Sequence, residues 1–262
     1  MYRSSRSSSS RRRWSAPNRR LTQLYPSLRS LYISDLHLSE ERSEANERFF
    51  RFVEQDVKGA DALYVLGDLF EYWIGDEDVG SSFNAVMVGF FRRLADAGTK
   101  LYFMHGNRDF LFGERFARAA GGKLLADPSV MDGVLLMHGD TLCTDDADYQ
   151  AWRRKARSAE FQADFLAKPL DERRAVVHGL REKSKEVIGA KPADIMDVNE
   201  GAVREAFRRH GVTRMVHGHT HRPGVHRLEV DGKRCERFVL PDWYGRGGYL
   251  EITKDKPKLV RW

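Results

Sequence analysis

Cysteine is scarce in this sequence, with only Cys143 and Cys235 among 262 residues. The two lie far apart and fit neither a zinc spacing nor a redox spacing, which indicates a reducing compartment. No apolar run approaches the 18 residues that a membrane-spanning helix needs. The first 27 residues also lack the apolar core of a secretory signal, so export is not expected.

Acidic residues and lysine are absent from residues 1–30, which hold eight arginines. The whole chain carries a net charge of +6, whereas residues 31–262 hold 36 basic and 38 acidic residues. The basic character therefore belongs to an Arg/Ser tail, residues 1–28, which we expect to be disordered. The tail resembles a transit peptide, and an early start codon or a tag would give the same composition. The nearly balanced body gives no reason to expect nucleic-acid binding.

Short apolar runs alternate with helical patterns from Leu31 onward, which predicts an α/β protein. A length of 262 residues suits one large domain, or a domain with an insertion. The expected strands are residues 31–34, 62–66, 100–104, 134–137 and 214–216, with two final strands at 237–240 and 248–253. The expected helices are residues 44–57, 83–97 and 114–120.

The segment Asp148–Arg209 lacks the alternation of strand and helix patterns seen before it. It is predicted to be wholly helical, with breaks at Pro169 and Pro192. Within it, residues 151–191 hold 11 basic and six acidic residues beside many apolar ones, including Phe161 and Phe165. A connection this long usually has a role of its own. It is either a helical hairpin packed on the body or a lid with an apolar groove and a cationic rim.

Five of the predicted strands end in potential metal ligands. These residues are Asp35 and His37, then Asp68, Asn107 and His138, and finally His217, His219 and His221. Ligand sites of α/β sheets lie at the carboxyl ends of strands. Carboxylate, imidazole and amide oxygen together suit Mn²⁺, Fe²⁺ or Zn²⁺, and the set is large enough for two ions. A bridging carboxylate lowers the repulsion between two dications, and Asp68 is the best candidate for that position.

The blocks Asp35-x-His37, Gly67-Asp68, Gly106-Asn107, His138 and Gly218-His219-x-His221 resemble those of the calcineurin-like metallophosphoesterases. Residues 67–76, 105–110, 138–146 and 217–223 are similar to a narrower family, the UDP-2,3-diacylglucosamine hydrolases of lipid A synthesis. The resemblance covers about residues 30–262. It implies a sandwich of two mixed sheets flanked by helices. We expect residues 29–147 and 210–262 to form this core, with residues 148–209 inserted as a helical lid.

The resemblance also implies which residues form the site. Two Mn²⁺ ions per chain are expected, one held by Asp35, His37, Asp68 and His221, the other by Asp68, Asn107, His138 and His219. The implied catalytic residues are Asp68, Asn107, Arg108 and His219. The implied substrate contacts are Asn107, Arg108, Asp146, Ser184, Lys191 and His219. Ile188 stands where the family has a polar contact, and His217 is expected just outside the ligand set.

The implied reaction is hydrolysis of UDP-2,3-diacylglucosamine to UMP and 2,3-diacylglucosamine 1-phosphate by metal-activated water at the α-phosphorus. Arg108 replaces the histidine usual in the superfamily; a guanidinium holds phosphate but gives up no proton at neutral pH. The alternatives are action on another phosphodiester or a phosphoprotein, and a non-enzymatic binding module. We expect a monomer in the cytoplasm, bound peripherally to the inner membrane through the cations of the lid.

Overall fold

Two mixed β-sheets lie face to face in the computed structural model, which describes residues 28–190 and 195–262, with only the helical backbone for 183–190. The first sheet has the order β11 (Lys256–Arg261), β10 (Gly248–Thr253), β1 (Arg29–Ile33), β2 (Ala62–Leu66), β3 (Lys100–Met104) and β4 (Lys123–Leu125). The second has the order β5 (Ser129–Met131), β6 (Val134–Leu136), β7 (Arg214–His217), β9 (Lys233–Val239) and β8 (Gly224–Val230). The predicted two-sheet α/β sandwich is confirmed.

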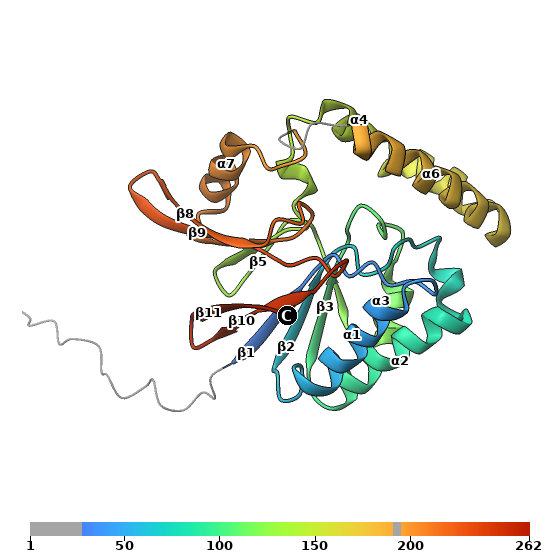
Figure 1. Cartoon of the computed structure of the whole chain (residues 1–262), viewed down its shortest axis with the longest axis horizontal. Coiled ribbons are helices and arrows are strands. Elements are labelled where there is room, and N and C mark those ends of the chain that lie inside the picture. Colours follow the sequence, from blue (N-terminus) through green and yellow to red (C-terminus); the bar gives the residue numbers. More distant parts are fainter. Residues whose placement is uncertain (1–27, 191–194) are drawn as a thin grey trace, which may run out of the picture.

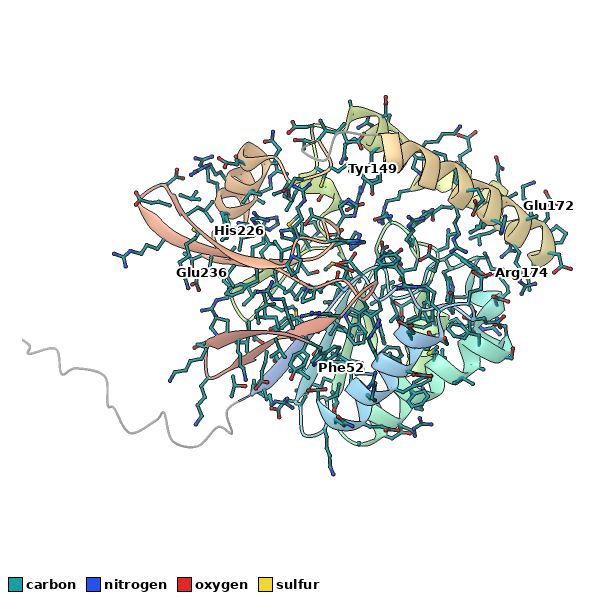
Figure 2. The ribbon with its side chains drawn as sticks, viewed as in Figure 1. Phe52, Tyr149, Glu172, Arg174, His226 and Glu236 are labelled. Atoms are coloured by element: carbon teal, nitrogen blue, oxygen red, sulfur yellow. The ribbon has the colours of Figure 1, made fainter. Side chains whose placement is uncertain are left out.

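Alternation along the strands assigns side chains to the layers of the sandwich. Leu31 and Ile33 of β1 face the helices α1 (Ser43–Gln55), α2 (Ser82–Asp96) and α3 (Glu114–Ala120), which cover the outer face of the first sheet (Figure 1). Tyr32 faces the opposite way, into the core between the two sheets. Phe52, labelled in Figure 2, is one of the large α1 side chains buried in the helix-covered layer.

The shared direction of neighbouring strands brings their carboxyl ends to the same edge of the sandwich. β1 to β4 run parallel, and β6, β7 and β9 run parallel in the other sheet. A row of stacked tyrosines, Tyr32, Tyr64 and Tyr102, crosses the first sheet with ring centroids 4.8 and 4.7 Å apart. This contact fixes the register of the three strands whose carboxyl ends carry candidate ligands.

The long segment after β6 forms four helices, α4 (Ala147–Ala156), α5 (Ala159–Leu166), α6 (Leu170–Ala190) and α7 (Glu200–His210). Pro169 directly precedes α6, as the predicted break requires; Pro192 lies outside the described residues. α7 buries Val203 and Phe207 against the outer face of the second sheet. It thus serves as a fourth layer of the body, whereas α4 to α6 extend over the carboxyl ends of the strands (Figure 1).

Four strands found in the structure were not predicted, namely β4, β5, β8 and β11. β4 and β5 have only three residues each. β8 exposes most of its side chains and so has no apolar run to identify it. The two strands expected after His221 are present as β9 and β10, and the unpredicted β8 and β11 pair with them.

No helix in the described part of the chain is long and apolar enough to cross a membrane. The Arg/Ser tail, expected over residues 1–28, falls outside the described residues except for Leu28. Cys143 and Cys235 are both buried free cysteines and form no disulfide bond with each other.

Candidate metal centre

The carboxyl ends of β1, β2, β3, β6 and β7 meet at one edge of the sandwich and bring together side chains separated by up to 186 positions. The residues gathered there are Asp35, His37, Asp68, Asn107, His138, His219 and His221. Ligand atoms of Asp35, His37 and His221 lie within 4.8 Å of one another, and so do those of Asp35, Asp68 and His138. The strand-end pattern in the sequence therefore corresponds to one cluster in space.

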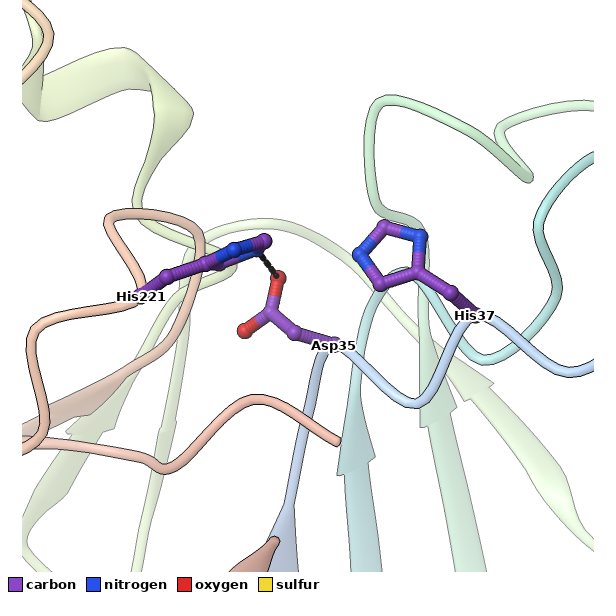
Figure 3. Close-up of side chains that lie close together, drawn as sticks. All are labelled: Asp35, His37 and His221. Carbon is purple, nitrogen blue, oxygen red and sulfur yellow. Dashed lines mark ion pairs between the residues drawn. The ribbon is translucent and has the colours of Figure 1, made fainter. Parts of the chain in front are cut away.

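The first group is built around the carboxylate of Asp35 (Figure 3). His221 Nε2 lies 3.5 Å from Asp35 Oδ1, and the ring of His37 faces the same carboxylate from the other side. The second oxygen, Oδ2, accepts a hydrogen bond from the backbone N–H of His219 at 2.8 Å and another from the Ser34 hydroxyl. Asp35 is thus fixed through Oδ2, and Oδ1 is left facing two imidazoles.

The second group is built around Asn107, whose Oδ1 lies 3.0 Å from His138 Nε2 and 2.9 Å from His219 Nδ1. Asp68 stands between the two groups. Its Oδ2 lies 3.7 Å from His37 Nε2 and 3.8 Å from His138 Nε2. That nearly equal separation is the arrangement a bridging carboxylate requires.

The atoms of the first group fit a metal ion. Within the described part of the chain, Asp35 Oδ1 and His37 Nε2 are buried and make no hydrogen bond. Such groups are costly unless something compensates them. The ring of His138 is held by a hydrogen bond instead, since its Nδ1 lies 2.9 Å from the carbonyl oxygen of Leu66. Donation of that N–H fixes the tautomer and leaves Nε2 as the ligand atom. Oxygen and imidazole donors without thiolate suit a divalent first-row metal.

The electrostatics of the cluster favour cations. Burial would raise the pKa of Asp35, but the facing imidazole of His221 and the charges of His138 and His37 hold it well below its usual range. Burial would lower the pKa of His138, but the carboxylates of Asp68 and Asp35 raise it to about 9. His219 responds oppositely: burial and the charge of His138 lower its pKa to about 4. Carboxylates that hold a proton on His138 so strongly would also attract a dication.

Five of the seven clustered residues have left-handed backbone conformations. The φ angles are 56° for Asp35, 52° for His37, 50° for Asp68, 67° for His219 and 55° for His221. Residues other than glycine rarely adopt this region, and Asp and His are among those that tolerate it best. Such strained positions collect at functional sites, where the surrounding structure enforces them.

Two glycines allow the loops to approach so closely. A Cβ on Gly106 would overlap the backbone nitrogen and carboxylate of Asp68, and one on Gly218 would overlap Ser34 and the carboxylate of Asp35. The close approach brings the loop of Asn107 against Asp68 and the loop of His219 against Asp35. The glycines of Gly106-Asn107 and Gly218-His219 are therefore a steric requirement of the cluster.

Asp109 supports the cluster from behind and was given no role from the sequence. The carboxylate is fully buried and accepts backbone N–H bonds from Gly106 at 2.9 Å and Leu69 at 2.8 Å, with longer ones from Asp68 and Phe70. It joins the loop after β2 to the loop after β3. The motif that contains Asp109 was recognisable in the sequence, but the sequence did not show that the carboxylate of Asp109 points into the protein.

His217 is buried but lies outside the cluster, as expected. Its Nδ1 is 2.9 Å from the carbonyl of Gly218, and its Nε2 faces the Arg237 guanidinium at 3.0 Å. Both ring nitrogens are thus occupied. Burial and the charge of Arg237 lower the pKa of His217 to about 3.

A second buried carboxylate, Asp140, connects the cluster to α4. Tyr149, labelled in Figure 2, donates its hydroxyl to Asp140 Oδ2 at 2.9 Å, and Arg153 donates Nε to the same oxygen at 2.6 Å. Arg157, directly after the end of α4, donates to the carbonyl of Gly106 at 2.8 Å. The tyrosine ring also packs against His219, with centroids 5.7 Å apart. α4 is thereby held against the residues of the second group.

The expected substrate contacts are only partly described. Arg108 places its guanidinium in a cavity beside the cluster, where it makes no hydrogen bond or ion pair with any described residue. Asp146 caps α4 by accepting the N–H of Tyr149 at 3.0 Å, at the junction of body and helices. The side chains of Ser184 and Ile188, and all of Lys191, lie outside the described residues.

The cavity beside the cluster lies between the body and helices α4 to α6. Its polar lining includes Glu71, Asn107, Arg108, Arg153, Arg157 and Arg181. Its apolar wall is formed by Trp73, Phe110, Leu111, Trp152, Phe161, Phe165, Val177 and Leu180. The lining therefore combines a candidate ligand, Asn107, and several arginines with a large apolar surface.

A two-layered sheet sandwich with clustered carboxylate, imidazole and amide ligands defines a dinuclear metal hydrolase, and the comparisons agree. Residues 28–223 match the calcineurin-like phosphoesterase family. A UDP-2,3-diacylglucosamine hydrolase of Aromatoleum aromaticum is 49% identical over 88% of this chain and 96% of its own length. Those of Chromohalobacter salexigens and Escherichia coli O81 are 47% and 45% identical over 88% of this chain, covering 96% and 98% of their lengths. The chain belongs to the calcineurin-like phosphoesterases and, within them, to the UDP-2,3-diacylglucosamine hydrolase family.

Proposed function

We propose that this protein hydrolyses the pyrophosphate bond of UDP-2,3-diacylglucosamine in lipid A synthesis, giving UMP and 2,3-diacylglucosamine 1-phosphate. The observation that carries the proposal is the cavity that joins a candidate dinuclear centre to an apolar chamber. A substrate with a nucleotide diphosphate and two acyl chains needs both environments side by side. The names of the relatives support the same substrate.

The proposed ligands are Asp35, His37, Asp68 and His221 for one ion, and Asp68, Asn107, His138 and His219 for the other. When bound, two divalent ions, proposed to be Mn²⁺, supply Lewis-acid charge for an in-line displacement and lower the pKa of water. The attack by water on the α-phosphorus breaks its bond to the bridging oxygen, which leaves on the sugar phosphate.

Arg108 and Asn107 hold the phosphate groups in this proposal. The Arg108 guanidinium is free to form a bidentate contact with phosphate oxygens. It offers charge and not a proton, which suffices because the leaving group is a phosphate monoester. His219, Asp146, Ser184 and Lys191 are the further proposed substrate contacts, and Ile188 replaces a polar one.

We restrict the proposed lid to α4, α5 and α6, because α7 packs on the second sheet. Phe161 and Phe165 line the proposed acyl chamber. Burial of a methylene contributes about 0.8 kcal/mol, so even part of an acyl chain is a large share of substrate affinity. The net positive charge of residues 151–191 would hold a cytoplasmic monomer on the anionic inner-membrane surface.

A Mn²⁺-supplemented assay tests the proposal, with UDP-2,3-diacylglucosamine compared with UDP-glucose and bis-p-nitrophenyl phosphate. The expected result is a strong preference for the diacylated substrate, abolished by Asp68→Ala. Equal turnover of the three compounds would instead favour a phosphoesterase of another specificity. An active Asp68→Ala variant would overturn the dinuclear mechanism.

A further inference from the structure

Glu71 is a buried carboxylate between a proposed metal ligand and the lid. Its Oε2 lies 3.2 Å from His37 Nδ1 and 3.3 Å from the hydroxyl of Tyr244. Its Oε1 faces Arg181 of α6, at 3.1 Å from Nη2 and 3.2 Å from Nε. The side chain of Glu71 is 7% exposed and that of Arg181 is 16% exposed, so neither contact is a solvated surface pair.

The contact with His37 lies on the side of the ring away from Asp68. Nε2 faces Asp68 Oδ2 at 3.7 Å, and Nδ1 faces Glu71. A neutral imidazole has one protonated nitrogen and one lone pair, so a carboxylate at Nδ1 selects the tautomer that presents the lone pair at Nε2. Such partners also orient the ring and raise its basicity towards a metal. Tyr244 packs on the same ring, with centroids 4.8 Å apart.

α6 has contacts with the body besides that of Arg181. The same helix is anchored by Arg173, which pairs with Glu77 at 3.0 Å and donates to the carbonyl of Ile74 at 2.9 Å. Arg174 forms a further ion pair with Asp78. Arg181 differs from these anchors because its partner also faces a proposed metal ligand.

We propose that Glu71 is a positioning residue that couples the docking of lid helix α6, through Arg181, to the alignment of His37 and hence to metal occupancy. The inference rests on the ligand role of His37 in the proposed function. With α6 docked, Arg181 holds one carboxylate oxygen and thereby directs the other at Nδ1. With α6 displaced, the carboxylate is free to turn and His37 loses its orientation.

Glu71→Gln is the informative substitution because it keeps the size and shape of the side chain. His37 and Arg181 face different oxygens of Glu71, and an amide keeps an acceptor at only one of these two positions. Glu77→Gln is the matched control, since it removes an ion pair to the same helix without touching a proposed ligand. Mn²⁺ is titrated calorimetrically into the full-length, metal-stripped proteins without substrate, and circular dichroism checks that each variant is folded.

The expected result is a 10- to 100-fold weaker affinity at one of two Mn²⁺ sites in Glu71→Gln, as for other partners of metal-bound histidines. Glu77→Gln should match the wild type. Arg181→Gln should weaken the same site, and the double variant should lose less than the two single losses combined. Wild-type affinity in Glu71→Gln, or an equal loss in Glu77→Gln, would overturn the coupling. A wild type that binds no Mn²⁺ would instead contradict the proposed function.

Discussion

Replacement of Asp140 by alanine tests how strongly α4 is fixed to the body. The carboxylate is fully buried and accepts from Arg153 Nε at 2.6 Å and Tyr149 Oη at 2.9 Å. Removal leaves a guanidinium, 19% exposed, without its closest anion. Breaking a buried ion pair from one side costs about 3–5 kcal/mol, and loss of two hydrogen bonds to a charged group leads to a similar figure. The expected loss is a large fraction of the roughly 5–15 kcal/mol that stabilises a typical domain.

Urea unfolding followed by far-ultraviolet circular dichroism, at pH 7.5 in EDTA, measures this loss without a contribution from metal binding. Glu205→Ala is the control, because the Glu205–Arg209 pair on α7 is exposed and should contribute less than about 0.5 kcal/mol. A change below about 1 kcal/mol for Asp140→Ala would refute the claim that a buried pair fixes α4.

The pH dependence of the same contact has a definite sign. Burial would raise the pKa of Asp140, but the charges of His138, His219 and Arg153 hold it below its usual range. A carboxylate whose pKa is lowered in the folded protein stabilises it above the unfolded pKa of about 3.9 and loses that contribution as the pH falls further. The stability difference between the wild type and Asp140→Asn should therefore shrink below about pH 4. An unchanged difference would show that the charge of Asp140 is not what stabilises the contact.

Three further outcomes are expected. Gly106→Ala should reduce kcat at least tenfold while the protein stays folded, because the new Cβ displaces Asp68; unchanged kcat would contradict the steric argument. EDTA should abolish hydrolysis, and Mn²⁺ at 100 times its dissociation constant should restore it and stabilise the fold by about 2.7 kcal/mol for each occupied site in thermal unfolding; activity retained in EDTA would exclude the metal mechanism. Phe161→Ala with Phe165→Ala should raise KM for a long-chain substrate far more than for a short-chain analogue, whereas Phe90→Ala, away from the cavity, should affect neither; equal effects on both substrates would mean that the two rings serve only as core.

The order of strands and the candidate ligands were predictable because both follow from short-range patterns. An apolar run marks a buried strand, and a ligand directly after it must lie at the carboxyl edge of the sheet. Asp35 and His138 are examples, although 103 positions separate them. The fold class followed from the same alternation of strands and helices.

The supporting residues were not predictable in that way. Glu71 and Asp140 have partners on α6 and α4, and the contact between Glu71 and Arg181 spans 110 positions. Nothing in the local sequence tells whether such a carboxylate faces solvent or a buried arginine. α7 has the apolar spacing of any amphipathic helix, so the sequence predicted residues 200–209 as part of the lid, whereas α7 packs on the second sheet. β8, with its exposed polar side chains, lacks even the signal that marks the other strands.

The pairing of β1 with β10 has a consequence for synthesis of the protein. Asp35 and His37 emerge early from the ribosome, but His221 follows 186 residues after Asp35, and the strand that completes the edge of β1 is Gly248–Thr253. Domains fold as units, and contacts of long sequence separation form only once both partners are available. A nascent chain therefore lacks part of the proposed centre until His221 and β10 have been made. Chains that end before His221 would lack one proposed ligand of the first group and the strand that pairs with β1.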